Sequence, residues 1–132
     1  MLVFLVRHAH SEAGDPDDAR PLSERGQAEA QALAERLAAH ETPPRLVLSS
    51  PLVRARQTAE HVALAVGAEA RVEERLAPGA TAELLRDALA ALEGPVAAVA
   101  HQPDCSEIML ALTGSDPGFP AAGLAELEVD VP

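Results

Sequence analysis

The chain opens with MLVFLVRHAHSE, residues 1–12, in which an unbroken apolar run ends directly in an arginine and a histidine. The run from Leu2 to Val6 has the length and the continuous apolar character of a strand that is buried on both faces of a sheet. Arg7 and His8 follow at once, although charged side chains are rarely buried without a partner. We therefore expect a buried strand that delivers two polar groups to one edge of a sheet.

The rest of the chain alternates between strand-like and helix-like segments. Further strands are predicted at residues 46–48, 70–73 and 96–100, and a final antiparallel edge strand at 126–131, where apolar and polar residues alternate. Helices are predicted after Ser23, after Ser50 with Pro51 at the first helical position, from Thr81 with Leu84 and Leu85 inward, and from Cys105 to Gly114. This alternation favours an α/β fold, a three-layer sandwich around a mostly parallel central sheet.

Length and composition limit the class of protein. With 132 residues the chain is expected to form a single domain, residues 1–132. Its net charge of −11 and its aromatic content of 2% disfavour nucleic-acid and anionic-membrane partners. Cys105 is the one cysteine, so an intrachain disulfide is impossible. The apolar start is too short for a membrane span and lacks a signal-peptide pattern, so we expect a cytoplasmic protein.

Polar residues follow three of the predicted strands. Arg7 and His8 end the first strand, His101 follows the run VAAVA, and Arg54 lies in the helix after LVLSS. In open α/β sheets, ligands bind beyond the carboxyl ends of the strands. We therefore expect these four residues to form an electropositive pocket in an otherwise acidic protein.

This set of residues favours phosphoryl transfer. The planar guanidinium group matches phosphate oxygens, and an imidazole can act as a nucleophile. Two histidines without carboxylate or thiol ligands at suitable spacing make a poor zinc site, so no metal or other cofactor is expected. The sequence also contains no phosphate-binding glycine loop of the P-loop type and no serine elbow. Transfer through a phosphohistidine, with arginines neutralising the phosphoryl oxygens, fits these residues best.

These motifs resemble the histidine phosphatase superfamily, the phosphoglycerate mutase-like proteins. The resemblance rests on RHA at residues 7–9, PLSERGQAEAQAL at 21–33, SSPLVRARQTA at 49–59 and AHQP at 100–103. It implies a phosphoglycerate mutase-like fold and a hydrolase that works through a phosphorylated His8. It also implies that Arg7, Arg54 and His101 bind the transferred group, and that water then hydrolyses the phosphoenzyme.

Within that superfamily the chain is similar to the SixA-like branch of small bacterial phosphohistidine phosphatases. The short chain and the placement of Asp18 and Arg20 before Pro21 carry this likeness, which implies that Arg20 reaches the pocket rim. The asparagine that mutase-like members carry after the RHG motif is absent, and Gly14 lies near the corresponding place. No recognisable glutamate acid occurs in EERLAPGATAE, residues 73–83.

A missing acid has a chemical consequence for the substrate. An alkoxide leaving group needs a proton, whereas a phosphorylated histidine leaves as neutral imidazole once its other ring nitrogen is protonated. We therefore expect a phosphatase that prefers P–N to P–O bonds and acts on phosphohistidine in a protein of the histidine phosphotransfer type. Two alternatives stay open: a phosphatase for small phosphorylated metabolites, and a phosphate- or phosphoprotein-binding module without turnover.

Several nearby residues have simpler interpretations. His10 is expected at the pocket rim without a role, and Glu12 is a weak candidate for a proton donor. Asp15, Asp17 and Asp18 are expected on a loop surface, with Asp18 orienting Arg20. Cys105 is expected in the core because it falls on the apolar face of its helix.

Overall fold

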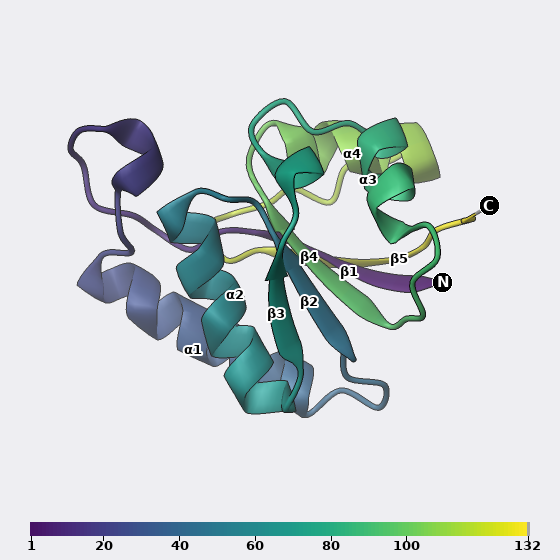
Figure 1. Cartoon of the computed structure of the whole chain (residues 1–132), viewed down its shortest axis with the longest axis horizontal. Coiled ribbons are helices and arrows are strands. Elements are labelled where there is room, and N and C mark those ends of the chain that lie inside the picture. The colour runs from purple at the N-terminus through teal and green to yellow at the C-terminus, as the bar shows by residue number, and fades with distance from the viewer. Residues whose placement is uncertain (132) are drawn as a thin grey trace.

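A computed structural model describes residues 1–131 and shows a central sheet between two layers of helices (Figure 1). The strands are β1 (Leu2–Arg7), β2 (Leu46–Ser49), β3 (Glu69–Val72), β4 (Val96–Ala100) and β5 (Leu124–Glu128). The helices are α1 (Glu24–Ala38), α2 (Val53–Val66), α3 (Ala82–Leu89) and α4 (Asp104–Thr113), with short 3-10 turns η1 (Asp17–Ala19) and η2 (Glu74–Leu76). None of the described helices is long and apolar enough to cross a membrane. The α/β three-layer sandwich predicted from the sequence is confirmed.

The strand order is β3-β2-β4-β1-β5, and all neighbouring pairs are parallel except β1 with β5. The register places Arg7 beside Ala100 at the carboxyl ends of β1 and β4. The next residues, His8 and His101, therefore leave adjacent strands at the same edge of the sheet. The His8 N–H donates to the Ala100 carbonyl, with an N···O distance of 3.1 Å, and so ties the two strand ends together.

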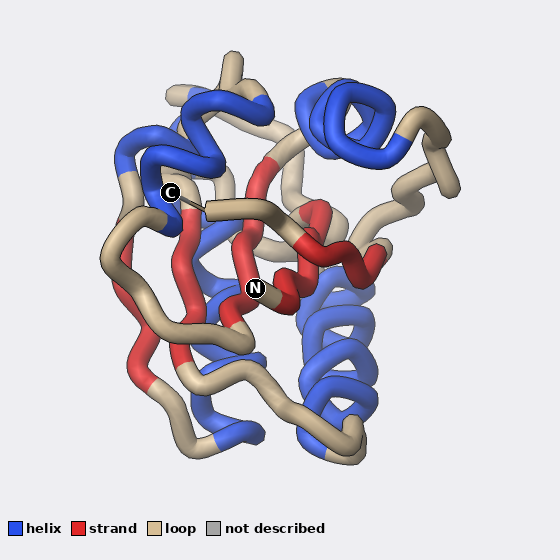
Figure 2. Tube along the Cα trace, turned by 90° about the vertical axis from the view of Figure 1, so that its right-hand side faces the viewer, coloured by secondary structure: helices blue, strands red, loops and turns tan. Residues whose placement is uncertain are grey.

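Alternating side chains of the buried strands form two cores, one on each face of the sheet. Phe4 and Val6 of β1 pack with residues of α1 and α2 on one face. Val3 and Leu5 pack with residues of α3 and α4 on the other. Figure 2 shows the helices on both sides of the strands. This packing fixes the register of β1, because a shift by one residue would exchange the two faces.

Three local predictions were wrong in detail. Ser50 does not cap a helix that begins at Pro51: its N–H donates to the Val99 carbonyl at 3.0 Å and so prolongs the β2–β4 pairing, and α2 begins only at Val53. Leu84 does not face inward but is 36% exposed, because consecutive helical positions are turned by about 100° and Leu85 takes the inward side. The last strand, Leu124–Glu128, starts and ends earlier than the predicted residues 126–131 but has the predicted alternation and antiparallel pairing.

Candidate active site

A pocket of about 470 Å³ opens at the carboxyl ends of β1, β2 and β4. Its lining residues are Arg7, His8, His10, Ser11, Asp17, Arg20, Arg54, Pro78, His101, Gln102 and Ala121. The structure therefore brings together all five residues that the sequence placed at this site. Three of the lining side chains are guanidinium groups and one, Asp17, is a carboxylate, so the pocket is electropositive in a protein of net charge −11.

His8 is held in one orientation by its own backbone. Its Nδ1 lies 2.7 Å from the Ala9 carbonyl oxygen, which can only accept a hydrogen bond. The proton of the neutral ring is therefore on Nδ1, and Nε2 keeps its lone pair. Burial lowers the pKa of His8 to about 4, and the charges of Arg54 and Arg7 act in the same direction against the opposing bond to Ala9. At neutral pH the ring is uncharged, and its Nε2 lone pair is available for reaction.

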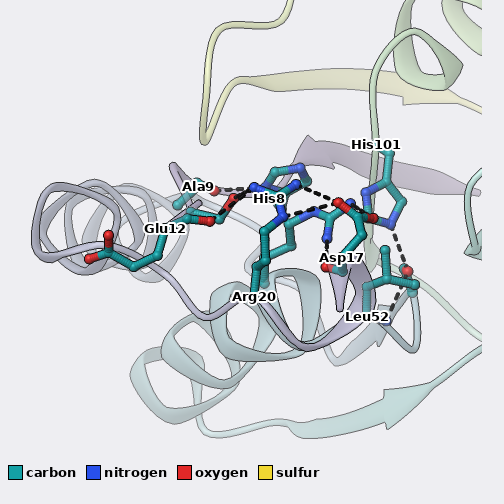
Figure 3. Close-up of polar contacts among 10 residues, drawn as sticks. His8, Ala9, Glu12, Asp17, Arg20, Leu52 and His101 are labelled. Atoms are coloured by element: carbon teal, nitrogen blue, oxygen red, sulfur yellow. Dashed lines mark hydrogen bonds and ion pairs between the residues drawn. The ribbon is translucent and has the colours of Figure 1, made fainter. Parts of the chain in front are cut away.

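His101 lies beside His8 with ring centroids 5.1 Å apart. Its Nε2 is 2.7 Å from the hydroxyl oxygen of Ser50, which also accepts from the Leu52 N–H at 3.3 Å. Figure 3 shows the other ring nitrogen of His101 on the side of His8. Burial and the neighbouring His8 and Arg54 lower the pKa of His101 to about 4. Ser50, which the sequence predicted as a helix cap, therefore orients the buried imidazole of His101 at the pocket.

Arg7 anchors its guanidinium group through one bond and leaves another donor free. Its Nη1 donates to the Phe119 carbonyl at 2.9 Å. Its Nε is buried and has no hydrogen-bond partner among the described residues. An unsatisfied buried donor costs about 1–3 kcal/mol. The guanidinium group of Arg7 thus keeps unused hydrogen-bonding capacity in the wall of the pocket.

Arg54 is almost fully buried, with its side chain 8% exposed, because it stands in the first turn of α2 beneath the η1 turn. Its Nη1 donates to the Asp17 carbonyl at 2.8 Å, and its Nη2 lies 3.3 Å from Asp17 Oδ2. Both terminal nitrogens thus meet the same residue. The hydrogen bond to the Asp17 backbone carbonyl holds the Arg54 guanidinium at the pocket. The Asp17 carboxylate, in contrast, is exposed to solvent.

Arg20 reaches the pocket rim, as the family resemblance implied. Its Nε and Nη2 contact Asp17 Oδ1 at 3.0 and 2.8 Å, and its Nη1 donates to Ser11 Oγ and the Glu12 carbonyl, each at 3.0 Å. The prediction that Asp18 orients Arg20 was therefore wrong, and Asp17 does so. Figure 3 shows Asp17 and Arg20 converging on the side chains of His8 and His101.

Two buried residues that the sequence did not mark position the loop that follows His8. The Thr58 hydroxyl accepts from the Ala9 N–H at 3.0 Å and donates to the Arg54 carbonyl at 2.8 Å, so it links the β1 loop to α2. Gly26 lets α1 approach the same loop, since a Cβ at that position would lie 1.9 Å from the His10 carbonyl oxygen. The signals for both lay in the quoted motifs, at the T of SSPLVRARQTA and the G of PLSERGQAEAQAL.

The carboxylates that could donate a proton lie elsewhere or are strongly ionised. Glu12 points away from the pocket in Figure 3. Glu73 binds Arg75, at 2.8 Å, outside the pocket. Arg20 and then Arg54 lower the pKa of Asp17 through their hydrogen bonds and charges. From residues 73–83 only Pro78 lines the pocket.

The pocket wall at Pro78 is held by a buried carboxylate that the sequence did not single out. Asp104 is 6% exposed, and its Oδ2 accepts from the N–H groups of Gly79 and Ala80 at 2.9 and 3.2 Å. Asp104 begins α4, directly after the segment His101–Pro103. The loop after η2 and the strand end at His101 are therefore fixed to each other.

Of His10, His40 and Cys105, only His10 lines the pocket. His10 lies at the rim, where its Nδ1 is 2.6 Å from Ser23 Oγ. His40 packs edge-on against Phe4 and pairs with Glu126, and neither lines this pocket. Cys105 is buried in the core as predicted, and burial raises the pKa of its thiol to about 12.

The comparisons with known proteins agree with this fold and this set of residues. The model of the histidine phosphatase superfamily (branch 1) matches residues 3–80, more than half of the chain. The chain therefore belongs to the histidine phosphatase superfamily, and this membership supports a phosphatase activity.

Within the superfamily the chain is SixA-like. It matches the structure of the protein histidine phosphatase SixA complexed with tungstate, with a TM-score of 0.87 and 27% identity over 98% of this chain and 89% of that chain. It matches the putative phosphohistidine phosphatase SixA from Agrobacterium tumefaciens, with a TM-score of 0.84 and 32% identity over 98% and 91% of the two chains. An uncharacterized protein of Picosynechococcus sp. is 35% identical over 96% of this chain and 84% of its own length.

Proposed function

We propose that this protein hydrolyses phosphohistidine in a protein substrate through a phosphoryl group carried on His8. The observation that supports this most strongly is the meeting of four residues from three strand ends. The rings of His8 and His101 lie 5.1 Å apart, and Arg7 and Arg54 line the same pocket. This arrangement can surround one tetrahedral anion.

His8 is the proposed nucleophile. Its Nε2 lone pair is available because Nδ1–H is committed to the Ala9 carbonyl and because its pKa of about 4 keeps the ring neutral at pH 7. Attack by Nε2 on phosphorus forms a P–N bond and releases the leaving group. Water then attacks the phosphorus while the bond between Nε2 and phosphorus breaks and its electron pair returns to Nε2. Phosphate leaves with the protons of the attacking water, and His8 is regenerated.

Arg7, Arg54 and His101 are proposed to bind the phosphoryl group as it is transferred, with Arg20 at the rim. In phosphoryl transfer, charge spreads over three equatorial oxygens, and fixed donors stabilise it without reorganisation. Arg7 and Arg54 line the pocket together with His101 and can supply such donors. These cationic side chains supply the charge that a metal ion supplies in other phosphotransferases, so we propose that the reaction is cofactor-independent.

The substrate class follows from the proton supply. Asp17 is the carboxyl group that lines the pocket, and its lowered pKa makes it a poor acid for an alkoxide leaving group. A phosphohistidine whose other ring nitrogen is protonated leaves as neutral imidazole and needs no enzyme acid. The likeness to structures described as phosphohistidine phosphatases supports the same choice.

A substrate panel tests the proposal. Wild type and His8→Ala are assayed with a phosphohistidine peptide, acetyl phosphate as a mimic of phosphoaspartate, a sugar phosphate and a nucleotide. We expect the highest kcat/KM with the phosphohistidine peptide and loss of turnover in His8→Ala. Equal or better turnover of the sugar phosphate would favour a small-molecule phosphatase instead. Absence of turnover with every substrate would favour a phosphate-binding module.

A further inference from the structure

Asp17 is a carboxylate in a pocket for a doubly charged anion, and the proposed reaction gives it no task. A negative charge beside Arg54 and Arg20 weakens the pocket for phosphate, because it repels the ligand that these side chains attract. Both of its oxygens are nevertheless engaged, Oδ1 with Arg20 at 2.8 Å and Oδ2 with Arg54 at 3.3 Å. The carboxylate is therefore held in place by the site itself.

Asp17 lies at the pocket mouth, whereas the proposed nucleophile lies deeper. The Asp17 side chain is 67% exposed, whereas His8 is half-buried and His101 is buried. The η1 turn that carries Asp17 stands out from the body of the protein and contacts α2 at its N-terminal end (Figure 1). In an in-line displacement the leaving group is on the side of phosphorus opposite to the nucleophile. With His8 below the phosphorus, the leaving group lies toward the mouth, where Asp17 is.

A carboxylate at this position suits one kind of leaving group. The protonated ring of a phosphohistidine presents a cationic N–H, which a carboxylate accepts in a strong charge-assisted hydrogen bond. A leaving group that departs as an anion, or that carries further negative charge, is repelled. We propose that Asp17 binds the protonated imidazole of the substrate and so selects a phosphohistidine over phosphate esters, an inference that rests on the proposed function.

The step balances without a further reactant. The lone pair of His8 Nε2 forms the new P–N bond while the P–N bond of the substrate breaks, and its electron pair returns to the substrate nitrogen. The other ring nitrogen of the substrate keeps its proton throughout and donates it in a hydrogen bond to Asp17. The substrate histidine therefore leaves as neutral imidazole, and Asp17 stays ionised.

The proposal has to be separated from a purely structural role, in which Asp17 only holds the two arginines. Asp17→Asn makes this separation. The shorter contact to Arg54 comes from the Asp17 backbone carbonyl, at 2.8 Å against 3.3 Å for the carboxylate, and this carbonyl is retained in the variant. The asparagine side chain also keeps a carbonyl oxygen for Arg20. The substitution therefore removes the negative charge and leaves the main anchors.

The charged and titratable groups around Asp17 are those of the pocket. Arg54 from α2 and Arg20 from the end of the η1 turn contact it directly, and His101 feels its charge. Asp18 offers a matched control, since it belongs to the same turn and carries the same charge but does not line the pocket. Asp18→Asn thus changes the net charge equally at a neighbouring exposed position.

The experiment compares two substrates in wild type, Asp17→Asn and Asp18→Asn. One is a phosphohistidine peptide, and the other is p-nitrophenyl phosphate, whose leaving group departs as an anion without a proton. The readout is the ratio of the two kcat/KM values, because any loss of correctly folded enzyme cancels in it. We expect Asp17→Asn to lower the ratio of phosphohistidine to aryl phosphate at least tenfold, and Asp18→Asn to leave it within about twofold of wild type.

Two results would overturn the inference while the proposed function stands: an unaltered ratio in Asp17→Asn, which assigns Asp17 to positioning alone, or an equal fall in Asp18→Asn, which assigns the effect to overall charge. If wild type hydrolyses neither substrate, the proposed function fails, and the inference fails with it. The three results are distinguishable because each concerns a different protein or a different quantity.

Discussion

Removal of one buried hydroxyl tests how the proposed nucleophile, His8, is positioned. Thr58 is fully buried, and its Oγ1 is the partner of the Ala9 N–H, at 3.0 Å. Thr58→Val has nearly the same shape but leaves this N–H without a partner. The Arg54 carbonyl loses one donor yet keeps the helical hydrogen bond from the N–H of residue 58. The loss of stability therefore comes mainly from the unpaired N–H of Ala9.

The magnitude follows from that single unsatisfied group. A buried donor without a partner costs about 1–3 kcal/mol, so the free energy of unfolding is expected to fall by about that amount. Ala9 also carries the carbonyl that holds His8 Nδ1 at 2.7 Å, so a shift of Ala9 also moves the ring of the proposed nucleophile. We expect kcat to fall about tenfold, the factor that corresponds to about 1.4 kcal/mol.

The assay combines urea unfolding with turnover of p-nitrophenyl phosphate, and Thr58→Ser is the matched control. The serine keeps the hydroxyl and loses a methyl group, so its unfolding free energy falls by about 1 kcal/mol while its kcat stays near that of wild type. Wild-type stability and wild-type kcat in Thr58→Val would refute the reasoning, because the hydroxyl would then have no part in holding the loop.

Three further predictions concern the site and its supports. The pKa of about 4 for His8 and His101 predicts that NMR titration finds both rings neutral down to roughly pH 4, and that phosphate raises both midpoints because a dianion favours the protonated ring; midpoints near the ordinary 6.5 in the free enzyme would contradict this. Gly26→Ala gains about 1 kcal/mol of helix propensity but collides with the His10 carbonyl, so thermal unfolding should show a net loss of stability. Cys105, with its pKa raised to about 12, should react with a thiol reagent only after the protein unfolds, and fast labelling of the native protein would disprove its burial.

The parts of the fold that depend on local pattern could be predicted from the sequence. The continuous apolar runs of β1 and β4 mark strands buried on both faces, and the polar residues after them mark the edge of the sheet that carries the pocket. Arg7, His8 and His101 were found in this way because they follow strand ends directly. The place of Arg54 in the pocket could be predicted only by assuming that the helix after β2 begins at the same edge of the sheet.

The parts that depend on the path of a loop could not be predicted. Asp15, Asp17 and Asp18 are equivalent in the sequence, and only the η1 turn decides that Asp17 meets both arginines. Ser50 before Pro51 is a common helix-start pattern, yet its N–H extends the sheet, which depends on the pairing of two distant strands.

The most direct test of the central claim is to identify the phosphorylated residue during turnover. Wild type and His8→Ala are mixed briefly with a radiolabelled phosphohistidine substrate and quenched without acid, and the labelled peptide is located by mass spectrometry. The account predicts an acid-labile phosphoryl group on His8 in wild type and none in His8→Ala. Label that persists in His8→Ala, or rapid turnover by wild type with His8 never labelled, would contradict it.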